Sequence, residues 1–142
     1  MKKITLITLL LIAMLSGCKK ENTTDARDKY VGVWKGTHTV NIPLLNLNQQ
    51  TEGNQTISKS STNNQRLLVT SGTEMMNANM SGESYVFETY TYSENSDGVT
   101  WVIVLNGSGN LVGNTLAESG TISISIMGET YTGTWVSSMT KQ

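Results

Sequence analysis

Short segments that alternate apolar and polar residues, each followed by a tight-turn sequence, fill most of this chain. The clearest segment is 121–127, where three isoleucines alternate with serines, and the turn Asn95-Ser96-Asp97-Gly98 separates two others. Successive side chains of a strand point to opposite faces, so such alternation predicts half-buried strands. Asp-Gly supplies the positive φ that a tight hairpin turn needs. No segment after residue 18 shows the period of a helix of ordinary length, so the pattern predicts an all-β domain.

The predicted strands follow one another closely enough to form a single antiparallel meander. They lie at 30–40, 56–58, 66–71, 73–80, 84–93, 99–105, 110–116, 121–127 and 130–139, with turns at 106–109 and 118–120 among others; the stretch 41–50, interrupted by Pro43, has no clear assignment. An open meander exposes the amide groups of two edge strands, and closure into a barrel removes both edges. Eight strands enclose just enough space for side chains or for one small ligand. We therefore expect an up-and-down meander closed into a small barrel of eight to nine strands.

Tryptophans at the two ends of this domain indicate how the barrel closes. Gly32-Val33-Trp34 lies in the first predicted strand and Gly133-Thr134-Trp135 in the last, each with a glycine two residues before a tryptophan on the same face. If the first and last strands pair, the two indoles could fill the interior while the glycines leave room for them. The alternative is an open sandwich in which two unrelated tryptophans belong to the core.

The first 18 residues have the pattern of an export signal. Lys2 and Lys3 precede a mainly apolar run from Ile4 to Leu15, about half as long as the ~20 residues of a membrane-spanning helix. Leu15-Ser16-Gly17-Cys18 is similar to the lipobox of bacterial lipoproteins at all four positions. The resemblance implies cleavage before Cys18, diacylglycerol on its sulfur and acylation of the new amino terminus, and more than one acyl chain makes a stable anchor. The alternative is a lone cysteine after an ordinary secretory peptide.

These features divide the chain into a signal peptide (1–17), a lipid-anchored flexible tether (18–29) and a barrel domain (30–142). The tether is polar and lacks apolar periodicity. Cys18-Lys19-Lys20-Glu21 also resembles the short charged signals that route some Bacteroidetes lipoproteins to the cell surface, with a solvated linker as the alternative. The expected location is the bacterial outer membrane, on its periplasmic face or at the cell surface.

The first predicted strand carries a second resemblance. Tyr30-Val31-Gly32-Val33-Trp34 is similar to the Gly-x-Trp signature of lipocalins (calycins), and the Thr/Ser/Gly-rich meander that ends at Trp135 resembles the lipocalin-like lipoproteins of Bacteroidetes. Lipocalins usually stack a late basic residue on this tryptophan, and the only basic residue after Arg66 is Lys141. The resemblance implies a barrel that binds a small apolar molecule in its mouth.

Aromatic and methionine side chains are the candidate ligand contacts in such a barrel, since they provide large or adaptable apolar surfaces. The candidate ligand-binding residues are Trp34, Tyr90, Trp101, Tyr131 and Trp135, with Met76, Met80 and Met127 as adaptable neighbours. A filled core without a cavity is the alternative interpretation of the same residues.

Residues for catalysis and metal binding are sparse. His38 is the only histidine, and with Cys18 acylated no His/Cys metal cluster and no Cys/His or Ser/His pair is easily built. We expect His38 inside the barrel on the Trp34 face or at its rim, and no two carboxylates are brought together by spacing. Without Lys2 and Lys3 the 10 basic residues fall to 8, against 11 acidic residues, so nucleic-acid binding has no support. We therefore expect a non-enzymatic protein without metal or cofactor.

Two functions are compatible with these observations. The first is a lipid-anchored module that binds a small apolar ligand in the barrel. The second is a protein-facing module with a filled core, either an adhesin or an inhibitor of an envelope-active enzyme. Ser81-Gly82-Glu83-Ser84-Tyr85 resembles part of the inhibitory loop of lysozyme-inhibitor lipoproteins, although the basic residue and the cysteine pair of those proteins are absent.

Overall fold

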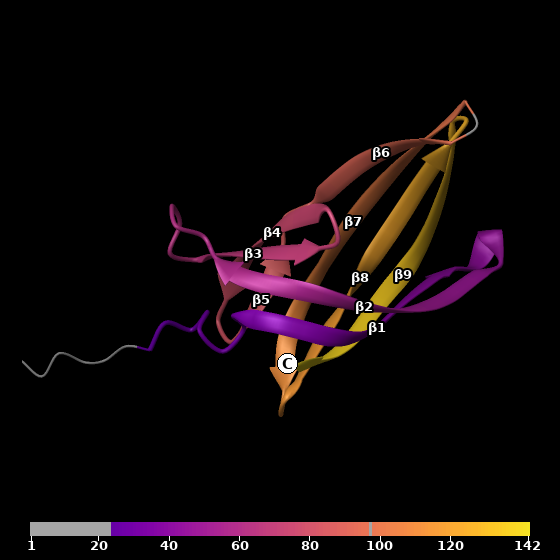
Figure 1. Ribbon diagram of the computed structural model, residues 1–142. Helices are drawn as coiled ribbons and strands as arrows, with labels where there is room; N and C mark the ends of the chain where they lie inside the picture. The colour runs from indigo at the N-terminus through magenta and orange to yellow at the C-terminus, as the bar shows by residue number, and fades with distance from the viewer. Residues whose placement is uncertain (1–23, 97) are drawn as a thin grey trace, which may run out of the picture.

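The structure is a computed structural model that describes residues 24–96 and 98–142. Its described part contains nine β-strands and one short 3-10 helix, η1 (Figure 1). They are β1 (Gly32–Ile42), η1 (Pro43–Leu45), β2 (Leu47–Lys59), β3 (Arg66–Ser71), β4 (Glu74–Ser81), β5 (Ser84–Phe87), β6 (Tyr90–Ser96), β7 (Val99–Val112), β8 (Thr115–Ile126) and β9 (Glu129–Lys141). The prediction of an all-β domain is therefore confirmed. None of the helical residues described here forms a stretch that is both long and apolar enough to cross a bilayer.

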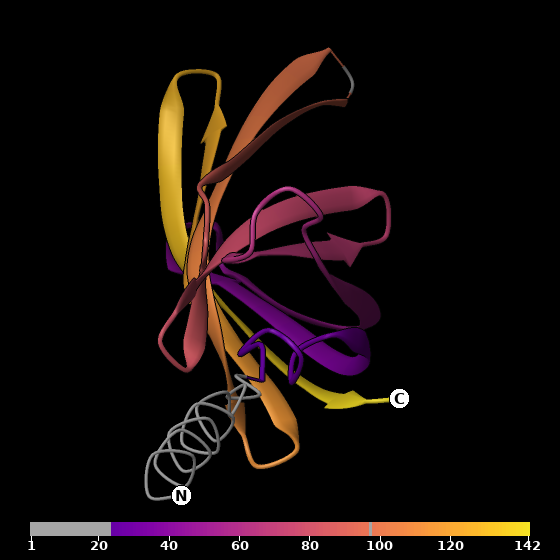
Figure 2. The same cartoon turned by 90° about the vertical axis from the view of Figure 1, so that its left-hand side faces the viewer.

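The strands pair antiparallel in the order β5-β4-β3-β2-β1-β9-β8-β7-β6, and β5 also pairs with β7. Eight strands thus form a closed ring, and β6 is an extra strand on β7. The first and last strands pair from Trp34 opposite Lys141 to Asn41 opposite Thr134. The predicted closed meander of eight to nine strands is confirmed. Figure 2 shows the β6–β7 and β8–β9 hairpins extending together, away from the β3–β4 hairpin.

Four predicted boundaries are wrong, and inward-facing glycines explain two of them. The predicted strand 110–116 contains the turn between β7, which ends at Val112, and β8, which begins at Thr115. The predicted turns at 106–109 and 118–120 lie inside β7 and β8. Gly107 and Gly109 face inward under aromatic rings, because a Cβ on Gly107 would lie 2.6 Å from a ring atom of Trp135 and one on Gly109 would lie 2.3 Å from a ring atom of Tyr85. The predicted strand 84–93 is interrupted between β5 and β6, since β5 pairs with β4 and the end of β7, whereas β6 pairs with β7 alone.

Two paired glycines on β7 and β8 lie beneath the indole of Trp135 on β9. Gly107 pairs with Gly120, and Gly120 pairs with Trp135. A Cβ on Gly120 would overlap the carbonyl oxygen of Asn106 and lie 2.6 Å from the Cα of Gly107. The Trp135 Nε1 donates a hydrogen bond to the same Asn106 oxygen at 3.1 Å. The bare glycines let β7 and β8 approach each other closely beneath the ring.

Two apolar clusters form the core of the barrel. The Trp34 cluster contains Tyr30, Trp34, Ile57, Leu67, Val69, Ala78, Tyr85, Phe87, Leu116 and Met139, and the Ile122 cluster contains Ile42, Ile103, Ile122 and Ile124. Trp135 packs against both clusters, so it lies at their boundary. Within the Trp34 cluster the ring of Tyr85 meets the rings of Tyr30 and Phe87 edge to face, which is an arrangement that aromatic pairs prefer.

The two tryptophans of the end strands fill different levels of the barrel. Trp34 lies opposite Lys141 and Trp135 opposite Val40, so about 20 Å of strand separates them at ~3.4 Å per residue. The expectation that Gly32 and Gly133 make room for these indoles is wrong. A Cβ on Gly32 would lie 2.7 Å from the Cε of Lys141, and one on Gly133 would lie 2.8 Å from Ile42 Cγ1. These glycines accommodate a lysine and a neighbouring strand instead.

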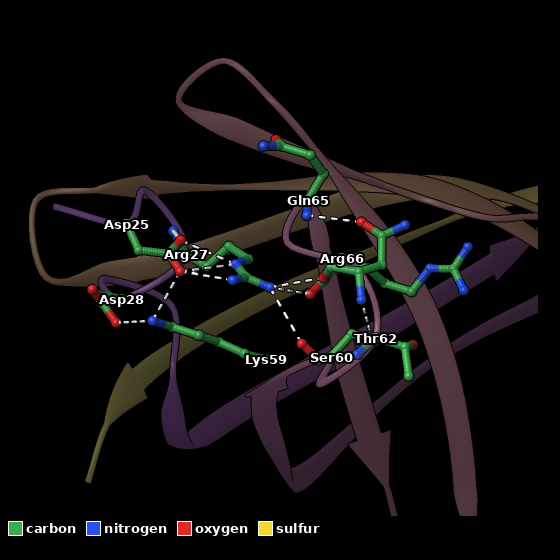
Figure 3. A network of polar contacts seen from close by, with 9 residues as sticks. Asp25, Arg27, Asp28, Lys59, Ser60, Thr62, Gln65 and Arg66 are labelled. Carbon is green, nitrogen blue, oxygen red and sulfur yellow. Dashed lines mark hydrogen bonds and ion pairs between the residues drawn. The ribbon is translucent and has the colours of Figure 1, made fainter. Parts of the chain in front are cut away.

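The described part of the predicted tether, residues 24–29, lies against the barrel. The Arg27 guanidinium donates to the carbonyl oxygens of Asn63 at 2.9 Å and Arg66 at 3.2 Å, and pairs with Asp25 at 2.7 Å (Figure 3). Lys59 pairs with Asp25 at 3.0 Å and also with Asp28. Arg27 is only 7% exposed. These contacts, here named the Arg27 clasp, attach the chain to the β2–β3 connection.

Candidate functional site

A cavity of about 220 Å³, half open to solvent and here called the interior cavity, lies where the Trp34 and Ile122 clusters meet. Its apolar wall comes from Met76, Phe87, Tyr92, Leu105, Ile122 and Trp135, and its polar wall from His38, Gln55, Ser71, Glu118 and Ser137. A larger hollow of about 640 Å³ lies among asparagine and threonine side chains of β1 and β7–β9, and no ionisable residue lines it. Ligand sites are usually concave and mostly apolar, with a few converging polar groups. The interior cavity is therefore the candidate site.

Glu118 is the buried acid of this cavity. Its side chain belongs to β8 and is only 5% exposed. Oε1 accepts hydrogen bonds from Gln55 Nε2 at 2.9 Å and from the Tyr85 hydroxyl. Burial raises the pKa of Glu118 above its usual value, although hydrogen bonds from Tyr85, Gln55 and Ser137 act in the opposite direction. The pKa of Tyr85 is also raised, by burial and by the nearby Glu118, so Tyr85 remains a neutral donor.

His38 and Ser137 form the second polar group of the cavity. They lie opposite each other on β1 and β9, and the His38 Nδ1 is 2.7 Å from the Ser137 Oγ. The His38 Nε2 is buried and has no hydrogen-bond partner among the described residues. Burial lowers the pKa of His38, which favours the neutral imidazole. The barrel wall thus carries a neutral imidazole whose Nε2 is covered by the surrounding protein.

The order of these groups differs from that of a catalytic triad. In a triad the acid orients the histidine through the nitrogen that faces away from the serine. Here Glu118 hydrogen-bonds with Ser137, and the far nitrogen of His38 has no partner in the described chain. The expectation that no Ser/His pair forms is wrong, because strand pairing brings together residues 99 positions apart. Within the described residues no three His, Cys, Asp or Glu side chains form a metal site.

Replacing Glu118 by glutamine should flatten the dependence of stability on pH. The pKa of Glu118 is raised in the folded state, so its contribution to stability is complete below the unfolded pKa and is lost as pH rises through the folded one. The glutamine side chain keeps the Oε1 acceptor and stays neutral. As the pH rises from the unfolded-state pKa to the folded-state pKa of Glu118, the free energy of unfolding of the unmodified protein should fall by about 1.4 kcal/mol per pH unit relative to that of E118Q.

Urea unfolding of both proteins from about pH 4 to about pH 8 measures this difference. Asp25, Glu83 and Glu88 have lowered pKa values, so their contributions to the stability of the folded protein are lost toward low pH. Their effect is common to both proteins and cancels in the comparison. Parallel stability curves would show that Glu118 titrates normally.

The five aromatic residues predicted as ligand contacts occupy different parts of the fold. Trp135 lines the cavity, whereas Trp34 is 2% exposed and donates from Nε1 to the Tyr30 carbonyl oxygen at 2.7 Å. The Tyr90 hydroxyl bonds to Glu74. Trp101 and Tyr131 pack against the Ile122 cluster. Of the neighbouring methionines, Met76 lines the cavity and Met127 is 86% exposed. Cys18, the predicted lipidation site, lies outside the described residues.

The polar wall was not predicted as a site. His38 does lie inside the barrel on the Trp34 face, as expected. Gln55 and Glu118 share the inward-facing parity of their strands, since Gln55 alternates with buried Ile57 and Glu118 with buried Leu116. For Gln55, this parity could have indicated an inward-facing side chain from the sequence. For Glu118 the same inference was blocked by Gly120, which indicated a turn.

Lys141 occupies the place that the lipocalin resemblance assigns to a late basic residue. Its Nζ lies 5.6 Å from the centre of the Trp34 ring, within the range of a cation–π interaction. Gly32 leaves the space through which the lysine side chain passes. The Gly-x-Trp sequence and Lys141 therefore form one packing unit at this end of the barrel.

No protein-family model matches the chain, and no curated protein matches it. Among solved structures, the chain is similar to a protein of unknown function of the DUF3598 family from Nostoc punctiforme, with 15% sequence identity and a TM-score of 0.44. The match covers 80% of this chain and 48% of that one, so the chain spans about half the length of that protein.

Proposed function

We propose that this protein is a non-enzymatic lipoprotein of the bacterial outer membrane, anchored through Cys18, whose barrel binds one small, mainly apolar molecule. The observation that carries the proposal is the interior cavity, which combines an apolar wall from six strands with the partly buried His38 and the buried Glu118.

The size of the cavity limits the ligand. A dry cavity of about 150 Å³ binds benzene, and pockets for drug-sized molecules measure about 300–1,000 Å³. The cavity of about 220 Å³ lies between these values. A compound of one or two rings fits this volume, whereas a bilin is too large for it.

The seam between β4 and β6 is the best route of access. Both strands contribute to the cavity wall, through Met76 and Tyr92. No ladder joins these two strands in the described part of the chain, because β6 pairs only with β7. Side-chain contact across the seam comes from the Tyr90 hydroxyl and Glu74. Opening here needs no break in the main-chain hydrogen bonds of the ring.

The Arg27 clasp supports the proposed anchor by restricting the distance between barrel and membrane. Thr24, where the described chain begins, follows Cys18 by six residue steps. At ~3.3–3.6 Å per residue they reach about 20 Å. A lipid on Cys18 would therefore hold the β2–β3 connection close to the bilayer.

Filling the cavity should abolish ligand binding. Met76 lines the cavity, while its neighbour Met75 points outward and is 58% exposed. We expect Met76→Trp to weaken binding of 2-naphthol, a two-ring probe, by at least about 10-fold, because the indole takes its space. Met75→Trp should bind as the unmodified protein does.

Isothermal titration calorimetry on the mature protein in detergent measures both variants, with circular dichroism as a check on folding. Equal binding by Met76→Trp and Met75→Trp would place the probe elsewhere. No binding by the unmodified protein would reject the ligand proposal and favour the protein-facing alternative, with a filled core.

A further inference from the structure

The interior cavity is lined by one acid and by no basic side chain that carries a fixed charge. Glu118 is the one carboxyl group among the described residues that line it, and none of them is a lysine or arginine. No ion pair within the described part of the chain involves Glu118. We infer that the occupant of the cavity is an arylalkylamine, an apolar ring compound whose ammonium group pairs with the Glu118 carboxylate. This inference rests on the proposed function and specifies its ligand class.

The carboxyl group of Glu118 lies in the wall of the interior cavity. Its Oε1 accepts a hydrogen bond from Gln55 Nε2 at 2.9 Å, and Gln55 lines the same cavity. Ser137 lies opposite Glu118 on β9, hydrogen-bonds with the carboxyl group and is also a lining residue. The bonds from Gln55 and Tyr85 both go to Oε1, and Oε2 is not among the fully covered atoms that lack a partner. Two lining side chains therefore hold the carboxyl group at the cavity, which leaves Oε2 as the acceptor for a ligand.

The groups around Glu118 hydrogen-bond to the carboxyl group without neutralising its charge. Its donors are all neutral side chains, namely Gln55, Tyr85 and Ser137. The other titratable lining residues are His38 and Tyr92, and burial keeps both neutral by lowering the pKa of His38 and raising that of Tyr92. A buried charge is costly unless it is paired. An ammonium group would supply the missing opposite charge, whereas an anion would meet a charge of its own sign.

Three aromatic side chains complete the proposed site. Phe87, Tyr92 and Trp135 line the interior cavity, and the ring centroids of Phe87 and Trp135 are 5.8 Å apart. Aromatic rings attract ammonium groups as well as apolar rings. Because the cavity is half open to solvent, water can bind those ammonium protons that Glu118 does not accept. The lining therefore suits both parts of an arylalkylamine, the ring and the charged group.

Three probes with the same two-ring body test the inference: 2-naphthylmethylamine, a cation at neutral pH, 2-naphthalenemethanol, which is neutral, and 2-naphthoate, an anion. The amine should bind at least about 10-fold tighter than the alcohol, because charge-assisted hydrogen bonds are about twice as strong as neutral ones. It should bind at least about 100-fold tighter than 2-naphthoate. In Glu118→Gln the advantage of the amine over the alcohol should disappear. Glu52→Gln, which removes the same charge from an exposed site of β2, should keep it.

Calorimetry of the unmodified protein at several pH values tests the same contact without a variant. An ammonium group pairs with the ionised carboxyl group, so its binding competes with protonation of Glu118. Burial raises the pKa of Glu118, and below that pKa the affinity for the amine should fall by up to about 10-fold per pH unit. The affinity for the alcohol should stay constant. Protonation of His38 would also repel the amine, but Glu118→Gln retains His38, so the difference between the two proteins isolates the carboxyl group.

The outcomes separate this inference from the proposed function. Binding of the alcohol by Glu118→Gln shows that the cavity persists in the variant, so the ratio of amine to alcohol reports on the charge pair. Equal affinities for amine and alcohol, tight binding of 2-naphthoate, or an amine preference that survives in Glu118→Gln would overturn the inference while leaving a binding cavity. If Glu118→Gln does not fold, an amine affinity of the unmodified protein that ignores pH would overturn it equally. Failure of all three probes to bind would overturn the proposed function itself.

Discussion

Replacing Cys18 by serine is expected to move the protein from the membrane fraction to the soluble fraction of the cell envelope. Each buried CH₂ of an acyl chain contributes about 0.8 kcal/mol to membrane binding, and one chain alone gives only reversible attachment. The lipobox resemblance implies several chains on Cys18. Their loss removes the anchor entirely, so we expect membrane-bound protein to fall by at least about 100-fold.

Labelling with radioactive palmitate separates lipidation from other causes of membrane association. The label should appear in the unmodified protein and in Lys19→Ser, which keeps the cysteine, and should be absent from Cys18→Ser. An uncleaved signal peptide could hold Cys18→Ser at the membrane, so the label is the decisive measurement. Palmitate on Cys18→Ser, or none on the unmodified protein, would refute the anchor.

Strand identity was predictable because alternation is a local property. The segment 121–127 lies in β8, except for Met127, which has a φ of 52° in the turn to β9. The pairing of β1 with β9 was also predictable, from related tryptophan sequences at both ends of the domain. The closure of the ring through β5 and β7 was not predictable, because only two residue pairs form it, Tyr85 opposite Gly109 and Val86 opposite Ser108.

The cavity depends on contacts between strands, which local patterns do not contain. Glycine most often indicates a turn, so Gly107 and Gly120 were assigned to turns although they lie beneath Trp135 inside the barrel. Because of that error, Glu118 was expected near a turn and not in the barrel interior. His38 was placed on the correct face, but its partner Ser137 comes from the last strand. Only the register of β1 against β9 brings the two together.

Replacing Gly120 by alanine is expected to lower the free energy of unfolding by about 3 kcal/mol, at the upper end of the usual cost of overpacking. A Cβ at this position would overlap the carbonyl oxygen of Asn106 on the neighbouring strand. Main-chain atoms cannot rotate away as a side chain can, so β7 and β8 must separate. Their separation would also disturb the hydrogen bond from Trp135 to Asn106.

Two control variants isolate this effect in urea unfolding experiments. Ser119→Ala changes an exposed side chain of the same strand and should alter stability by less than about 0.5 kcal/mol. Gly53→Ala meets only the His38 ring, at 3.3 Å, and should cost less than Gly120→Ala because a side chain can shift. The expected order of stability is therefore Ser119→Ala, then Gly53→Ala, then Gly120→Ala. If Gly120→Ala is as stable as Ser119→Ala, the close approach of β7 and β8 is wrong, and so is the wall that carries Glu118.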